Sequence, residues 1–103
     1  MMHKMEAVEK HIDKAMKTSH KYIECALKYQ EEDKDLADIF YWLSAEAMAH
    51  AEKLHKYTKD AIEKYRKKEG EVPQEMMILY NYVREREMEN AKDIKIMWDM
   101  YKD

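Results

Sequence analysis

The stretch LADIFYWLSAEAMA, residues 36–49, carries apolar residues on nearly every side of a helix. In a helical projection Leu36 and Leu43 lie on one side, and Tyr41 and Met48 lie on the opposite side. A helix that is apolar all round is normally buried all round. Two neighbouring helices of one chain cannot cover both sides, so we expect further copies of the chain to complete a four-helix or larger assembly. The alternative is a helix with a few exposed aromatic side chains, which is common on protein surfaces.

The composition of the whole chain favours helices. Its 103 residues, 46% hydrophobic and 40% charged, are enough for one domain with a core, residues 1–103. There is one Gly and one Pro, and the apolar residues recur at helical spacing. We therefore predict an all-α fold, an up-down-up bundle of three long helices over about residues 2–31, 35–68 and 73–101.

Two short stretches interrupt the helical pattern and mark the turns. In the first, Asp33 or Asp35 is suited to cap the start of the second helix. In the second, Gly70 suits the end of a helix, and Pro73 suits the first turn of the next one. Because both connections are short, consecutive helices are expected to run antiparallel.

The charges are mixed along the chain, with a formal net charge of −3 at pH 7. No basic patch stands out, so nucleic acid is not an expected partner. No apolar run reaches the length of a membrane span, and we expect no signal peptide and no membrane partner. Cys25 is the only cysteine, which excludes an intrachain disulfide, and a reducing cytoplasm is the expected location.

Polar residues interrupt the stripes that we assign to the core. The stripe of the second helix contains Leu36, Ile39, Phe40, Leu43, Ala47, Leu54, Tyr57 and Ala61. His50 and Glu46 lie on or beside this stripe, and Glu87 lies at the centre of the stripe of the third helix. Folding at the turns brings them to a similar height, with His20 and Glu24 of the first helix near them.

A carboxylate in a core requires pairing, protonation or a cation. These ligands suit Fe, Mn or Zn and predict a metal site, and the alternative is a buried His–Glu hydrogen bond that fixes the helix register.

The sequence DIFYWLSAEAMAHAEKLHKY, residues 38–57, resembles the second helix of ferritins and rubrerythrins. The similar features are Asp-Ile-Phe at its start, His-Ala-Glu-Lys-Leu in its centre, and the spacing from Asp38 to His50. The resemblance implies a four-helix, carboxylate-bridged di-iron protein that acts as a ferroxidase, a peroxidase or an iron store. His50 matches the metal-binding His of the family, and Glu87 is the candidate for the Glu of its third helix. Ala47 stands where the family has its bridging Glu.

A further pair, Glu52 and His55, has the Glu-x-x-His spacing of helical metal sites. It points away from the stripe that carries His50. We expect this side to be a solvated face or, if it is an oligomer interface, to form a metal site between chains.

Two functions follow from these patterns. The first is a ferritin-like homo-oligomer that binds iron, or else Mn or Zn, with at most a ferroxidase- or peroxidase-like activity. The second is a metal-free helical oligomer that serves as an interaction or structural protein.

Overall fold

Three helices and the two turns between them make up the described part of the chain. The computed structural model describes residues 2–102, and only the backbone of residue 2. Helix α1 spans Met2–Tyr29, α2 spans Lys34–Glu69 and α3 spans Gln74–Lys102. Residues 2–102 form no strand, so the predicted all-α fold is confirmed.

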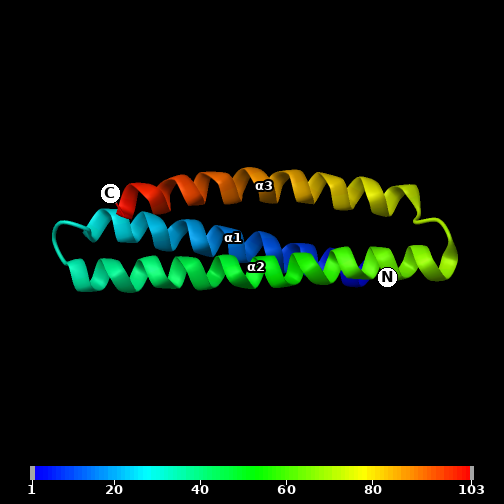
Figure 1. The fold of residues 1–103 in the computed structure, drawn as a ribbon, viewed down its shortest axis with the longest axis horizontal. Coiled ribbons are helices and arrows are strands. Elements are labelled where there is room, and N and C mark those ends of the chain that lie inside the picture. Colours follow the sequence, from blue (N-terminus) through cyan, green and yellow to red (C-terminus); the bar gives the residue numbers. More distant parts are fainter. Residues whose placement is uncertain (1, 103) are drawn as a thin grey trace.

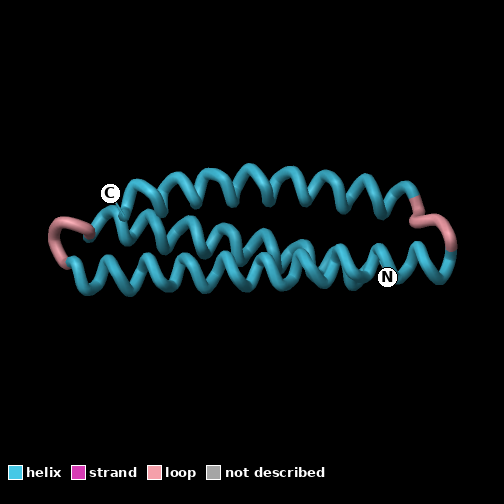
Figure 2. Tube along the Cα trace, viewed as in Figure 1, coloured by secondary structure: helices cyan, strands magenta, loops and turns pink. Residues whose placement is uncertain are grey.

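The helices lie side by side in an elongated body 56 Å long and 17 Å across in the other two directions. Figure 1 shows the two turns at opposite ends, so that α2 runs back along α1 and α3 returns along the bundle. The loops are short in Figure 2, which leaves nearly all of the length to helix. Helix α1 packs closely against α2 and also contacts α3, whereas α2 and α3 touch each other at few points. The helix that holds the bundle together is therefore α1.

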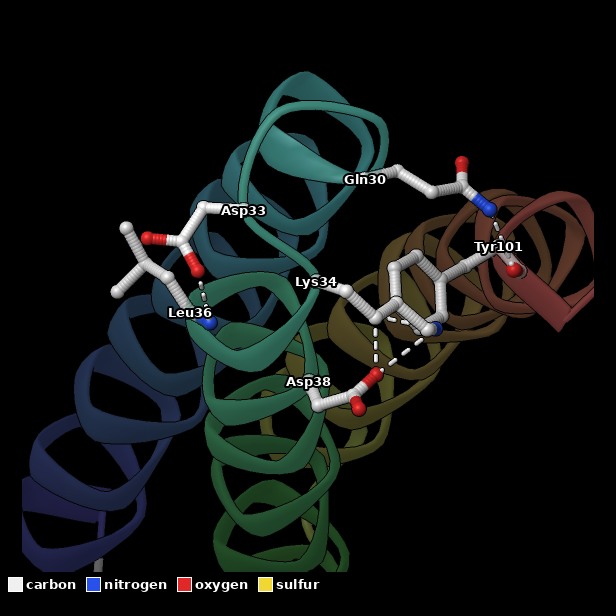
Figure 3. Close-up of polar contacts among 6 residues, drawn as sticks. All are labelled: Gln30, Asp33, Lys34, Leu36, Asp38 and Tyr101. Atoms are coloured by element: carbon white, nitrogen blue, oxygen red, sulfur yellow. Dashed lines mark hydrogen bonds and ion pairs between the residues drawn. The ribbon is translucent and has the colours of Figure 1, made fainter.

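The turn between α1 and α2 is set by Asp33, one of the two capping residues that the sequence predicted. The Asp33 carboxylate accepts a hydrogen bond from the Leu36 backbone N–H at 3.1 Å (Figure 3), which is the contact of an N-cap residue. The Asp33 backbone N–H donates to the Tyr29 carbonyl at 2.8 Å. Helix α1 ends at Tyr29, two residues before the predicted boundary at residue 31, because the chain turns toward this cap.

The turn between α2 and α3 contains the only Gly and the only Pro. Gly70 ends α2 with a φ of 88°, and its N–H donates to the Arg66 carbonyl at 2.9 Å. Glycine adopts this left-handed conformation without the steric cost that other residues have. Pro73 lies one residue before α3 rather than in its first turn, and its carbonyl accepts hydrogen bonds from the N–H groups of Met76 and Met77. The two turn signals thus lie within one residue of their predicted places.

The core is divided into two parts along the bundle. The larger part fills the middle and the end near Asp33. Its buried members are Ile12, Met16, Ile23, Ala26, Ala37, Met48, Ala51, Ile94 and Tyr101. The smaller part lies toward the end near Gly70 and consists of Met5, Ile62, Met76 and Tyr80. Each helix contributes to both parts, and members on the same helix stand three, four, seven or eleven residues apart, spacings that keep them on one face.

The buried face of α2 is not the one that the sequence analysis assigned to the core. Ile39 and Tyr57 of the predicted stripe are exposed, whereas Ala47 of the same stripe is buried. The buried face is centred about a quarter turn away from the stripe, on Ser44, Met48 and Ala51. Small residues on this side let α1 approach closely, and close packing is what stabilises a protein interior. The predicted core face was therefore wrong by about a quarter turn, because α2 is apolar on more than one side and the size of the side chains decides which side packs.

Two buried serines join α1 to α2. The Ser19 hydroxyl donates to the Ser44 carbonyl, and the Ser44 hydroxyl donates to the Ser19 carbonyl, both at 2.8 Å. The indole N–H of Trp98 on α3 donates to the Ser44 hydroxyl oxygen at 2.9 Å. Because buried polar groups are costly unless they are paired, this network fixes the alignment of the three helices.

Tyr101, in the last turn of α3, is held against the start of α2 (Figure 3). Its hydroxyl donates to a carboxylate oxygen of Asp38, and the Lys34 ammonium donates to the same oxygen at 2.9 Å and to the Tyr101 hydroxyl at 3.1 Å. The hydrogen bond from Tyr101, and then the one from Lys34, lower the pKa of Asp38. Gln30 donates from its side chain to the Tyr101 carbonyl at 2.8 Å. These contacts fasten the end of α3 to the turn between α1 and α2.

Candidate functional site

Three ionisable residues, one from each helix, separate the two parts of the core: Glu9 of α1, His55 of α2 and Glu87 of α3. We call them the Glu9–His55–Glu87 layer. Glu9 lies four residues after the buried Met5, and His55 lies four residues after the buried Ala51. Because residues four apart share one face of a helix, both side chains turn toward the core. The layer therefore places three ionisable groups between the two apolar parts of the core.

The closest polar contact of the layer joins His55 and Glu87. His55 Nδ1 lies 2.9 Å from Glu87 Oε2, and the two side chains are 29% and 15% exposed. The His55 ring also stacks on the ring of Tyr80, with centroids 5.9 Å apart and 23° between the planes. The stacking and the polar contact together fix the orientation of the imidazole.

Burial makes both carboxyl groups of the layer weak acids. It raises the pKa of Glu9 from 4.5 to about 7. It likewise raises the pKa of Glu87 from 4.5 to about 7, and the negative charges of Glu9 and Asp13 add to the effect. A buried carboxylate has lost its water shell, so the protonated form is favoured. The layer therefore gains and loses protons near neutral pH.

His55 is shifted in the opposite sense to the carboxyl groups. Burial lowers its pKa first, and the positive charges of Arg84 and Lys59 lower it further. The ring is therefore neutral near pH 7. Its contact with Glu87 is a hydrogen bond that shares one proton rather than a pair of full charges.

Two carboxylate oxygens of the layer, Glu9 Oε2 and Glu87 Oε1, have no hydrogen-bond partner within residues 2–102. Both atoms are shielded from solvent, and Glu9 as a whole is only 8% exposed. Buried polar atoms are normally paired, and leaving a carboxylate oxygen unpaired costs free energy. A proton or a cation removes this cost, so the layer is suited to bind either one.

A cavity of about 310 Å³ adjoins the layer on the side where α2 and α3 touch little. Four ionisable side chains line it, Glu52, His55, Arg84 and Glu87, and the remaining lining is Met and Ala. Methionine side chains are flexible and adapt to occupants of different shape. The layer can thus be reached from the gap between α2 and α3.

Glu46 and His50 do not belong to the layer. Both are exposed, on the side of α2 that faces away from the core. The prediction that His50 faces the core beside Glu46 or Glu87 is wrong, because α2 packs with a face that is rotated by about a quarter turn from the predicted stripe. The Glu-x-x-His pair, Glu52 and His55, supplies the inward histidine instead. A metal-binding role of Glu46 and His50 stays a prediction, now for the outer surface of α2.

His20 and Glu24 pair with each other rather than with Glu87. His20 Nδ1 lies 2.7 Å from Glu24 Oε1, and the two side chains are 44% and 55% exposed. They line a groove between α1 and α3 that also contains Asp13 and Arg86, which form an ion pair at 3.3 Å. The five predicted metal ligands are therefore spread over three places and do not form one centre.

Glu9 was not singled out as a core residue in the sequence analysis. The signal that identifies it is the spacing of the α1 stripe, since Met5, Glu9, Ile12, Met16 and Ser19 follow one another at three or four residues. Each of these residues is buried. A carboxylate residue that falls within such a series of buried residues occupies a core position despite its charge.

No group of three or more His, Cys, Asp or Glu side chains is arranged to hold a metal ion in the described part of the chain. The Glu9–His55–Glu87 layer offers oxygen and nitrogen donors of the kind that Fe, Mn and Zn accept, and two of its oxygens are unpaired. A metal ion requires its donors to converge on one point at about 2.0–2.2 Å. The donor types fit a metal, but their arrangement does not.

Comparisons with known proteins give no relative from which a function can be carried over. No protein-family model, curated protein or solved structure matches the chain. The resemblance of residues 38–57 to ferritins and rubrerythrins therefore stays a prediction. Within residues 2–102, none of the three helices combines the length and the apolar character that crossing a membrane requires.

Proposed function

We propose that this protein is a helical interaction protein, an up-down-up bundle of three long helices that is completed by assembly with further copies of itself. The observation that carries the proposal is the exposure of large apolar side chains on the outside of α2. Trp42 is 65% exposed, Ile39 54% and Tyr57 48%. At about 100° of rotation per residue, the three lie within about 60° of one line along the helix, opposite the buried face.

Covering these side chains is a source of binding free energy. Full burial of a large apolar side chain contributes about 1.5–3 kcal/mol, so burial of the exposed part of Trp42 contributes on the order of 1–2 kcal/mol. Single exposed apolar residues are common on monomers, whereas several on one line are typical of an interaction site. A second helix laid along α2 removes all three from water at once.

Sedimentation velocity of the full chain, from low to high micromolar concentration, tests this function. We expect a species heavier than one chain. Trp42→Lys is expected to weaken assembly by about tenfold, because it removes the binding free energy, on the order of 1–2 kcal/mol, that burial of Trp42 contributes. Met88→Lys is the matched control, because Met88 is 61% exposed but lines the cavity between α2 and α3. A wild-type chain that stays monomeric at every concentration contradicts the proposal.

The second candidate function, binding of a metal ion by a ferritin-like bundle, is favoured by the two unpaired buried oxygens of Glu9 and Glu87. In this proposal the side chains of the layer rearrange so that their donors converge on a cation, which replaces the proton that the layer holds near neutral pH. Iron is the ion that the resemblance implies, with Mn or Zn as alternatives, and any ferroxidase- or peroxidase-like activity belongs to this candidate alone. The donor types of the layer suit these ions.

Metal analysis of protein purified without a His tag separates the two candidates. If the second is correct, the wild-type chain retains iron, Mn or Zn, and Glu87→Gln loses it because one negative donor is gone. Glu24→Gln removes the same charge from an exposed position of α1 and is expected to keep the metal. A wild-type chain that takes up none of the three ions leaves the metal-free assembly as the function.

A further inference from the structure

Two exposed faces of equal length run along the outside of the bundle. The outer face of α2 consists of Ile39, Trp42, Glu46, His50, Lys53 and Tyr57, all exposed. The outer face of α3 consists of Tyr82, Glu85, Glu89, Lys92, Ile96 and Met100, also all exposed. Residues 39–57 and 82–100 each span about 27 Å of helix. Within each face the spacing is three or four residues, so the side chains lie on one line.

Both faces are apolar at their ends and charged in the middle, and the charges have opposite order. Along α2 the middle reads Glu46, His50 and Lys53, from negative to positive. Along α3, read from its C-terminal end, the middle reads Lys92, Glu89 and Glu85, from positive to negative. Reading one helix backwards corresponds to packing it antiparallel. The two faces therefore match only when the helices run in opposite directions.

We propose that the outer face of α2 in one copy packs antiparallel against the outer face of α3 in a second copy. The inference rests on the proposed function, because it names the contact through which the copies assemble. Three apolar pairs form toward the ends: Ile39 with Met100, Trp42 with Ile96, and Tyr57 with Tyr82. Three charged or polar pairs form in the middle: Glu46 with Lys92, His50 with Glu89, and Lys53 with Glu85. Every pair joins apolar to apolar or acid to base.

The charges in the middle of both faces have no ion-pair partner within residues 2–102. Glu85 and Glu89 are like charges four residues apart, a spacing at which they repel each other along a helix. The second copy brings Lys53 and His50 to these two glutamates. The contact therefore relieves a repulsion that exists within the single chain.

Other pairings of the same faces are less favourable. A parallel arrangement of α2 and α3 places Glu46 against Glu89, which are like charges, and sets Trp42 against Glu85. Two α3 faces packed antiparallel set Glu85 against Ile96 twice and leave the apolar part of the α2 face in water. Two α2 faces packed antiparallel produce no like charges but leave the whole apolar part of the α3 face in water. Like charges in contact disfavour the parallel pairing, and apolar residues set against charges or left in water disfavour the pairings of identical faces. The antiparallel contact of α2 with α3 is therefore the one that satisfies both faces.

This contact is heterologous, since it joins two different surfaces. Each copy offers one α2 face and one α3 face, so each copy has two neighbours. Such contacts produce a closed ring when the rotation between copies closes, and an open chain when it does not.

Charge reversal with mutual rescue tests the contact. Lys53→Glu and Glu85→Lys each place like charges in the pair of residues 53 and 85, and each is expected to weaken assembly about tenfold in sedimentation velocity. A double variant that carries both changes is expected to assemble like the wild type, because every contact between its copies again joins opposite charges. Lys14→Glu, an exposed position on α1, makes the same charge change outside both faces and is expected to assemble normally. Circular dichroism confirms that each variant keeps its helices.

The results separate the contact from the function on which it rests. If Glu85→Lys assembles as tightly as the wild type, or if the double variant fails to restore assembly, the contact is wrong while assembly as such stands. A pairing of two α2 faces gives the first of these results, because it does not involve α3. A wild-type chain that is monomeric overturns the proposed function and the contact together.

Discussion

Replacing Glu87 by Gln keeps the size of the side chain and removes its titration. In the folded chain the pKa of Glu87 is about 7, against a usual value of 4.5. The folded chain therefore keeps this proton to a higher pH than the unfolded chain does. The resulting contribution to stability is fully present below pH 4.5 and is lost as the pH rises through about 7.

The size of the effect follows from the difference between the two pKa values. One pKa unit corresponds to about 1.4 kcal/mol, so the difference from 4.5 to about 7 corresponds to roughly 3 kcal/mol. On the order of 2 kcal/mol of this is lost between pH 5 and pH 8. The Glu87 side chain is 15% exposed, so solvent screens little of the effect. Glu9 titrates in the same range and is coupled to Glu87, so the two losses do not simply add.

Urea unfolding followed by circular dichroism, at one protein concentration and at pH 5 and pH 8, measures this loss. We expect the free energy of unfolding of Glu87→Gln, relative to the wild type, to rise by about 2 kcal/mol from pH 5 to pH 8. The lowered pKa of His55 makes the folded chain more stable as the pH rises, which is the opposite effect. Because His55 is present in both chains, its contribution largely cancels in the difference between them. Glu6→Gln, at an exposed position of α1, is the control and is expected to show no such rise. An equal difference between Glu87→Gln and the wild type at both pH values refutes the assignment of a raised pKa to Glu87.

Three further substitutions test the fold by the same unfolding measurement at pH 7. Ser44→Ala removes the acceptor of the buried Trp98 N–H and is expected to destabilise the chain by about 1–3 kcal/mol, and a neutral result contradicts the network. Gly70→Ala is expected to cost about 1 kcal/mol from its φ of 88° alone, because nothing lies within 4 Å of the added Cβ. Asp33→Ala loses the bond from the Leu36 N–H and is expected to cost about 1 kcal/mol, whereas Asp33→Asn is expected to keep most of the stability.

The turns could be predicted from the sequence because their chemistry is local. Asp33 caps a helix through the N–H of a residue three positions away, and Gly70 adopts a backbone conformation that other residues avoid. Neither requirement depends on the rest of the fold. The helix boundaries were therefore correct to within two residues.

The core face of α2 could not be predicted in the same way. The helix is apolar on more than one side, and periodicity alone does not rank the side that carries Ile39 and Tyr57 against the side that carries Ser44. The choice is made by the close approach of α1, which is a property of two helices and not of one segment. As a result His55, and not the predicted His50, faces Glu87, whereas His50 faces outward. The candidate site shifted with it, and of the predicted ligands only Glu87 lies in the layer.

The division of the core has a consequence for how the bundle opens. The part near Gly70 is the smaller one, with Met5, Ile62, Met76 and Tyr80, and the buried serine network lies in the larger part. Regions with fewer buried apolar contacts open locally at a lower free energy. We therefore expect amide hydrogens around Ile62 and Met76 to exchange with solvent sooner than those around Ser44, the fraying beginning at the Gly70 end. Fraying that begins at the Gly70 end next reaches the Glu9–His55–Glu87 layer. Loss of the protons of the layer above neutral pH destabilises the layer, so the frayed segment becomes longer. The other end of the bundle, which is fastened by Tyr101, stays closed.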